Sequence, residues 1–149
     1  MAEKAQPSGR PSQAPYPLAM LTCDGVHTDP NSGKKTLLGC FSRVYCREFP
    51  ATHGPTALYV ALTDATGDVP LILRLVGADD KAPPLFEQEF VAHFDNKEST
   101  AELDVRFESI VFASPGEYRF QLFAEGHLLI QRRIFVESPE EAGHGSQHR

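Results

Sequence analysis

Apolar and polar residues alternate along the C-terminal part of the chain. In the stretch 114–136, SPGEYRFQLFAEGHLLIQRRIFV, the side chains of Tyr118, Phe120 and Leu122 are separated by single polar residues. A period of two places these three side chains on one face of a β-strand. A Glu-Gly pair then forms a turn, because glycine adopts positive φ without steric cost. The stretch therefore predicts a long β-hairpin, which needs a partner sheet to be stable.

Apolar segments with the same character recur through the preceding hundred residues. Segments rich in Gly, Pro, Asp and Asn separate them, and these residues favour turns. Together with the two hairpin strands they predict an antiparallel β-sandwich of about eight strands, an all-β fold. The first two are expected to form a hairpin around a polar loop. The predicted strands are Leu18–Cys23, Thr36–Tyr45, Ala57–Thr63, Pro70–Val76, Leu85–Phe94 and Ala101–Phe112.

Three positions within these segments depart from simple alternation. The phenylalanines of Leu85–Phe94 are four residues apart, as on a helical face, but the neighbouring strands favour a strand here. In Ala101–Phe112 the apolar parity changes, which predicts a bulge near Glu108 and Ser109. Gly39 lies inside a predicted strand, which indicates a bulge or a close approach of the backbone.

The two ends of the chain differ in composition from the middle. Residues 1–16 are rich in Pro, Ser, Gln and Gly, and residues 139–149 are similarly polar. Such segments bury too little apolar surface to offset the entropy lost on ordering, so both are expected to be disordered tails. The predicted β-sandwich domain is therefore 17–138, a size that can bury one substantial core.

Charge and cysteine content limit the partners and the compartment. The net charge is −6 with neutral histidines, and no basic patch accompanies it, so neither a nucleic acid nor an anionic membrane is expected as a partner. The sequence shows no signal-peptide or membrane-spanning segment. Three cysteines without a CxxC pair suit a reducing compartment, and we expect a cytoplasmic protein.

Three stretches of the sequence resemble a family of small, uncharacterised bacterial β-sandwich domains. They are LAMLTCDGVHTD, KKTLLGCFSRVY and PGEYRFQLFAEGHLLIQRRIFV, and the resemblance extends from about Leu18 to Val136. It implies an immunoglobulin-like fold and no established activity, so it supplies no catalytic residues. The terminal hairpin alone is also similar to glycan-binding sandwich modules, such as the C-terminal domains of polysaccharide-export ATPases.

Cysteine and histidine residues in the first third of the chain include the ligand types that zinc prefers. The close ligand pairs of structural zinc sites are missing, so we expect no metal and no other cofactor. A Cys–His nucleophilic dyad has no supporting motif either, and no catalytic residue is predicted. The alternative is a metal- or thiol-dependent enzyme built on Cys46, His53 and neighbouring residues. Its candidate metal ligands are Cys23, Cys40, Cys46, His27 and His53.

Aromatic residues on the less apolar face of their strands are the remaining candidates for recognition. Tyr45, Tyr59 and Phe123 have this position, and an exposed ring offers contact area at small entropic cost. We expect a non-catalytic binding or accessory module that contacts a protein partner or a second copy of itself. The alternative is a sandwich domain that binds a carbohydrate or another small ligand. An exposed strand edge, for which Arg132 and Arg133 are possible guards, offers another route to binding.

Overall fold

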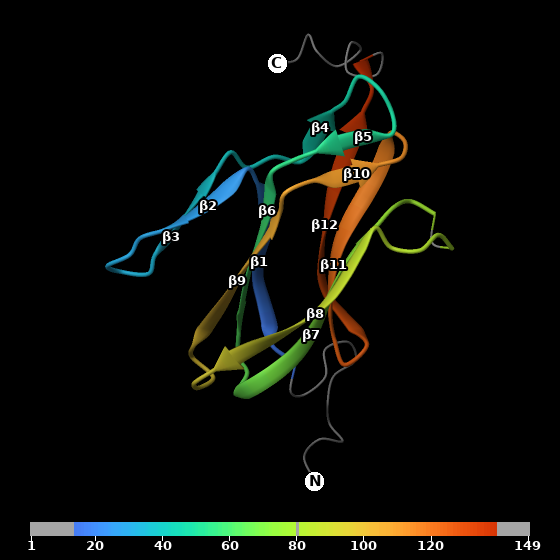
Figure 1. Cartoon of the computed structure of the whole chain (residues 1–149). Coiled ribbons are helices and arrows are strands. Elements are labelled where there is room, and N and C mark those ends of the chain that lie inside the picture. Colours follow the sequence, from blue (N-terminus) through green and yellow to red (C-terminus); the bar gives the residue numbers. More distant parts are fainter. Residues whose placement is uncertain (1–13, 80, 140–149) are drawn as a thin grey trace.

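The computed structural model describes residues 14–79 and 81–139, and these ranges contain twelve β-strands (Figure 1). The strands are β1 (Tyr16–Cys23), β2 (Gly25–Thr28), β3 (Lys35–Leu38), β4 (Arg43–Tyr45), β5 (Ala51–His53), β6 (Thr56–Thr63), β7 (Gly67–Val76), β8 (Phe86–Phe94), β9 (Thr100–Phe107), β10 (Ile110–Phe112), β11 (Gly116–Ala124) and β12 (His127–Glu137).

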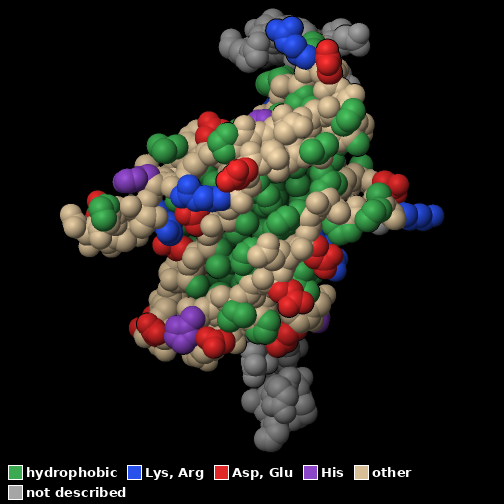
Figure 2. Space-filling model, viewed as in Figure 1, with side chains coloured by type: hydrophobic (Ala, Val, Ile, Leu, Met, Phe, Trp, Pro, Cys, Tyr) green, Lys and Arg blue, Asp and Glu red, His purple; other side chains and the backbone are tan. Residues whose placement is uncertain are grey.

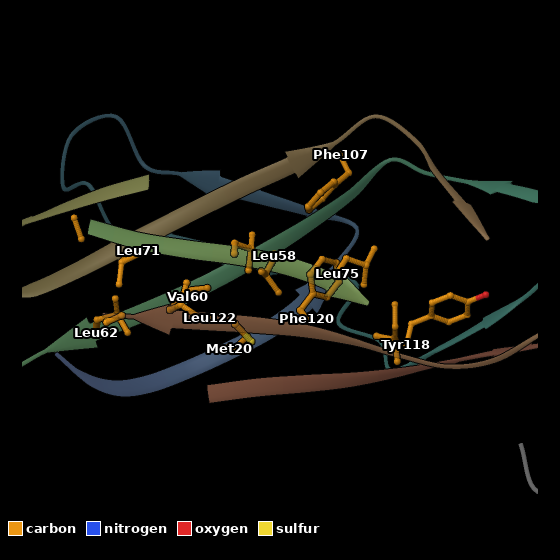
Figure 3. Close-up of a cluster of buried hydrophobic side chains, with 14 of the residues drawn as sticks. Met20, Leu58, Val60, Leu62, Leu71, Leu75, Phe107, Tyr118, Phe120 and Leu122 are labelled. Carbon is orange, nitrogen blue, oxygen red and sulfur yellow. The ribbon is translucent and has the colours of Figure 1, made fainter. Parts of the chain in front are cut away.

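Two sheets face each other across one hydrophobic core. One contains three strands in the order β1-β6-β9, and the other contains five in the order β4-β12-β11-β7-β8. Leu58, Val60 and Leu62 of β6 pack in one buried cluster with the inward side chains of β7 and β11 (Figure 3). Two further pairs flank this sandwich: the β2–β3 hairpin projects to one side, and β5 with β10 lies at one end (Figure 1). The prediction of an all-β sandwich is confirmed.

β11 and β12 form the predicted C-terminal hairpin. The turn between them consists of Glu125 with φ +53° and Gly126 with φ +79°. Positive φ at both central positions matches the right-handed twist of the paired strands, which is why a glycine is favoured there. The predicted inward face is also confirmed, since the side chains of Tyr118, Phe120 and Leu122 are buried.

Twelve strands arise from the eight predicted ones because two are divided and two short ones are added. Thr36–Tyr45 is divided into β3 and β4, Ala101–Phe112 is divided into β9 and β10, and β2 and β5 are new. Near Glu108 and Ser109 the chain leaves one sheet rather than forming a bulge, because β9 pairs with β6 and β10 pairs with β5. Apolar side chains on both sides of this break are buried, as the change of parity indicated.

The prediction of a hairpin between Leu18–Cys23 and Thr36–Tyr45 is wrong. β1 pairs with β6, β3 pairs with β2, and β4 pairs in parallel with β12 of the other sheet. The chain changes direction at Gly39, which has φ +69°, and the Asp24 amide donates to the carbonyl of Leu38 at 2.8 Å. A Cβ atom at Gly39 would overlap the Asp24 side chain, so the close approach predicted at this glycine is confirmed.

The phenylalanine-rich segment forms strand β8 and not a helix. β8 pairs with β7 along its length in antiparallel register, from Phe94 opposite Gly67 to Phe86 opposite Leu75. The Phe86 ring then packs edge-on against Phe107 of β9, with 4.8 Å between ring centroids. Tertiary pairing therefore overrides the helical propensity of the glutamates in this segment.

The ends of the described chain lie close to the predicted domain boundaries. Ala14 is already buried in the core, three residues before the predicted boundary at Pro17. Apart from residues 14–16 and 139, the predicted disordered tails lie outside the described residues. Within the described ranges, no helix has the length and apolar character needed to cross a membrane.

Candidate functional site

Apolar side chains gather on the outer face of the five-stranded sheet, which points away from the core. The strand register places Phe123 of β11 opposite both Ile72 of β7 and Leu128 of β12, and places Val91 of β8 opposite Pro70 of β7. Val91 is 63% exposed and Leu128 is 46% exposed. We call these five residues the outer apolar patch. Neighbouring apolar groups exposed on one face are typical of an interaction surface.

A groove of about 500 Å³ crosses the outer apolar patch. The carboxylate residues Glu89 and Glu125 also line it. The guanidinium group of Arg74 lies over the Phe123 ring, 4.8 Å from the ring centroid, and its Nε atom is 3.5 Å from a carboxylate oxygen of Glu87. Arg74 therefore covers one face of the Phe123 ring. Phe123 is the one residue of the predicted site that belongs to the outer apolar patch.

The other two predicted aromatic residues lie on separate surfaces. Tyr45 is 49% exposed at the end of β4, on the opposite edge of the five-stranded sheet from β8. Tyr59 belongs to β6 of the three-stranded sheet, where its hydroxyl donates to the Glu102 carboxylate. Burial, and then the hydrogen bond and negative charge of Glu102, raise the pKa of Tyr59 to about 12. The structure does not bring Tyr45, Tyr59 and Phe123 into one site.

Four members of the outer apolar patch were missed by sequence reasoning. Ile72 and Val91 occupy the outward parity of their strands, so their exposure could have been noticed from the alternation alone. Pro70 and Leu128 stand near strand ends, where parity is harder to assign. What the sequence could not supply was the order of the strands, which brings the four beside Phe123.

The candidate metal ligands do not converge. The Cys23 thiol is buried and donates to the carbonyl oxygen of Ala57 at 3.7 Å, whereas Cys40 is exposed. His27 is exposed on β2, whereas His53 of β5 packs against the rings of Phe41 and Phe112. Within residues 14–79 and 81–139, no three His, Cys, Asp or Glu side chains are grouped so that they could hold a metal ion.

The two less exposed thiols have the opposite electrostatics from a reactive cysteine. Burial raises the pKa of Cys46, and burial followed by the proximity of Cys40 raises the pKa of Cys23. A nucleophilic cysteine needs a lowered pKa, supplied by a neighbouring positive charge or helix terminus. Both thiols therefore remain protonated near neutral pH and act as small apolar groups.

A comparison with protein families matches residues 18–137 to a family described as "Family of unknown function (DUF6941)". The chain belongs to this family. The match spans nearly the same residues as the resemblance seen in the sequence, which confirms the prediction of a family of uncharacterised domains. Among curated proteins, none matches the DUF6941 chain.

One solved structure similar to the DUF6941 chain is an immunoglobulin-like protein from Pseudomonas aeruginosa. The two sequences are 16% identical, the alignment covers 89% of this chain and 99% of that one, and the TM-score is 0.44.

Two histidines of the DUF6941 chain have pKa values shifted in opposite directions. His53 packs between the rings of Phe41 and Phe112, and its buried Nε2 atom has no hydrogen-bond partner among the described residues. Burial lowers its pKa, partly opposed by the negative charge of Asp24. The exposed His93 is within hydrogen-bond distance of two carboxylates, Asp68 at 2.7 Å from Nδ1 and Asp95 at 3.0 Å from Nε2. These contacts, Asp68 first, raise its pKa.

We expect the stability of the DUF6941 chain to fall when the pH is lowered below about 6.5, the ordinary histidine pKa. In this window residue 53 binds more protons in the unfolded chain than in the folded one, because burial lowers the pKa of folded His53, so protons favour unfolding. Replacement of His53 with Phe keeps a ring in place and removes the titration. Urea denaturation of both proteins between pH 7.5 and 5.5 measures the difference, and the His53→Phe variant should lose less stability over that range.

The matched control for this prediction is His93→Asn. His93 has a raised pKa, so its protonation adds stability as the pH falls, and removing it should make the acid-induced loss steeper. If the His53→Phe and native proteins lose equal stability between pH 7.5 and 5.5, burial of neutral His53 is not the cause.

Proposed function

We propose that this chain is a non-catalytic binding module that contacts a protein partner through the outer apolar patch. The observation that carries the proposal is the exposure of Val91 and Leu128 beside Phe123 and Ile72, on four adjacent strands of a sheet whose other face already forms the core. Leaving apolar side chains in water costs about 25 cal/mol per Å² relative to burial. A partner surface would recover that free energy.

The geometry of the patch supports a protein partner over a carbohydrate. A sugar ring stacks on a free aromatic face, and Arg74 covers one face of the Phe123 ring. Of the three aromatic residues predicted from the sequence, Phe123 alone belongs to the patch; Phe90 also lines the groove but has the inward parity of β8. The alternative of a small ligand draws its support from the groove, where Glu89 and Glu125 could accept hydrogen bonds.

Other features of the chain support the non-catalytic character and the compartment in this proposal. The raised thiol pKa values of Cys23 and Cys46 are unsuited to nucleophilic chemistry. The net charge of −6 is unsuited to a nucleic acid or an anionic membrane. Cys23, Cys40 and Cys46 are all free thiols, which is consistent with the cytoplasm.

Site-specific photo-crosslinking in the native host tests the proposal. A benzoylphenylalanine residue replaces Val91 in the patch or, as a control, Val111, which is 55% exposed on β10 outside the five-stranded sheet. We expect a discrete protein adduct from position 91 and none from position 111. The captured protein should then bind the purified native chain, and Phe123→Glu should weaken that binding at least about tenfold, as for a charge placed in an apolar contact.

Three results would contradict the proposed function. They are equal adducts from both positions, binding that is unchanged by Phe123→Glu, or titration with oligosaccharides that perturbs the NMR signals of the patch when no protein adduct forms. The last result would favour the small-ligand alternative. Circular dichroism of each variant verifies that the fold is retained.

A further inference from the structure

The two facing sheets differ in width, so part of the wider one has no cover. Three strands stand opposite five, and β8 forms an edge of the five-stranded sheet. Phe86, Gln88 and Phe90 lie on the inward parity of β8, with the buried residues of the same strand, yet Gln88 is exposed and both phenylalanines are only partly buried. Leu73 of β7, which pairs with Gln88, is buried. The three-stranded sheet therefore covers β7 but leaves this part of β8 uncovered.

The other side of this opening is formed by β9, an edge strand of the three-stranded sheet. Leu103 and Val105 point inward from β9 and are also only partly buried. Figure 2 shows hydrophobic side chains exposed along the middle of this face, between β9 and β8. The rings of Phe86 from β8 and Phe107 from β9 contact each other across this opening. We call the inward residues Phe86, Gln88, Phe90, Leu103 and Val105 the seam.

The two strands that border the seam, β8 and β9, each have one edge whose backbone groups pair with no other strand among the described residues. Within the described residues, β9 pairs only with β6, and β8 pairs only with β7. The outer edge of each strand therefore presents N–H and C=O groups in the spacing that an added strand requires. A strand added beside β9 would widen the three-stranded sheet, so that it covers the inward face of β8. A strand added beside β8 would widen the five-stranded sheet and leave that face uncovered.

Acidic side chains predominate next to the seam. Glu102 and Asp104 project from the outer face of β9, where the outward side chains of an added strand would stand, whereas Glu87 and Glu89 project from the face of β8 opposite to the seam. Two basic residues accompany these four acidic ones. Arg74 pairs with Glu87, and the Nη2 atom of Arg106 lies 3.5 Å from the Oδ2 atom of Asp104. Within the described residues no ion pair engages Glu89. Opposite charges on adjacent strands stabilise their pairing, so the surroundings favour a strand with basic side chains.

We propose that the seam binds an extended segment of a partner protein, added as a strand beside β9, in which large apolar residues alternate with Lys or Arg. Alternate side chains of such a strand point to opposite faces. The apolar set would cover Phe86 and Phe90, and the basic set would stand near Glu102 and Asp104. The seam and the outer apolar patch lie on opposite faces of β8, so this site goes beyond the proposed function and does not depend on it.

A second copy of the chain fits the seam less well than a basic segment. Symmetric pairing of β9 with β9 would bring Glu102 and Asp104 of both copies together, with one basic residue, Arg106, for every two acidic ones. Like charges on adjacent strands are destabilising. Edge strands that carry such charges are protected from pairing with themselves.

The probe that tests this inference is a fluorescent eight-residue peptide of alternating lysine and valine, which matches the eight residues of β9. Binding to the full chain is followed by fluorescence anisotropy. One control peptide has the same composition with its lysines and valines in two blocks, and another has glutamate in place of lysine. We expect the alternating basic peptide alone to bind, and its affinity to decrease with added salt.

Two substitutions on β8 form a matched pair for the same measurement. Gln88→Lys places a positive charge in the seam at an exposed position, where the fold should tolerate it, and Val91→Lys places the same charge on the opposite face. Gln88→Lys should weaken peptide binding at least about tenfold, because it sets a charge against the apolar side chains that the peptide turns toward the seam. Val91→Lys should leave the affinity within about twofold. Hydrogen exchange should show slower exchange of β9 amides when the peptide is bound.

The inference is overturned if the alternating basic peptide does not bind, if either control peptide binds as well, or if Gln88→Lys and Val91→Lys have equal effects. Protection of β8 amides instead of β9 amides would contradict the placement of the strand. Sedimentation of the native chain as a dimer that Gln88→Lys dissociates would show that the occupant is a second copy. None of these outcomes depends on the crosslinking at Val91, so the two proposals can fail separately.

Discussion

Replacing Phe120 with alanine is expected to lower the free energy of unfolding by about 3–5 kcal/mol. Phe120 has no exposed surface, and its ring lies 5.6 Å from that of Phe107, so it connects the two sheets at the centre of the core (Figure 3). Truncation removes its buried surface and leaves a cavity that the facing sheets cannot close. Urea denaturation followed by circular dichroism measures the loss.

Phe123→Ala is the matched control, because residue 123 lies on the same strand with its side chain on the outer face. Its replacement should cost about 1 kcal/mol, the size of the lost contact with Arg74. Similar losses for the two variants would contradict the assignment of Phe120 to the core and of Phe123 to the outer apolar patch.

Gly54→Ala is expected to have the second largest effect, a loss of about 3 kcal/mol, at the upper end of overpacking costs. A Cβ atom at Gly54 would overlap the carbonyl oxygen of Glu108 and lie 2.9 Å from the Cα atom of Ser109. These are backbone atoms at the break between β9 and β10, so relief requires the chain itself to move. Denaturation measures the loss, and hydrogen exchange should quicken first in β5 and β10, which pair beside this contact.

Gly25→Ala provides the comparison for Gly54→Ala. A Cβ atom at Gly25 would meet no atom within 4 Å, so the substitution should change stability by less than about 1 kcal/mol. If Gly54→Ala were as mild as Gly25→Ala, the close approach of residues 54 and 108 would not be a constraint on the fold.

The strands could be predicted because their alternation is local. Each strand face needs only the identities of residues two positions apart, which is why the burial of Tyr118, Phe120 and Leu122 was foreseen. The same logic detected the change of parity at Glu108 and Ser109. It could not tell a bulge from a change of sheet, because the answer depends on β5, a distant segment of three residues.

The candidate site was only partly predictable for the same reason. Parity identified Phe123 as an outward ring, but it identified Tyr45 and Tyr59 equally well, and these lie on other surfaces. The neighbours of Phe123 are set by the order β12-β11-β7-β8, in which β7 and β11 are adjacent although about 40 residues of sequence separate them. Ile72 and Val91 therefore joined the patch only in the folded chain.

The sequence by itself determined which segments are extended and which of their side chains point inward, because a period of two is written into consecutive residues. Only the tertiary structure decided which strands pair, that β4 joins β12 in parallel instead of closing a hairpin, and that three strands stand opposite five. Strand pairing uses backbone hydrogen bonds, which are the same for nearly every residue type. The choice of partner is therefore made by packing across the whole core, and the uncovered seam beside β9 is a result of that choice.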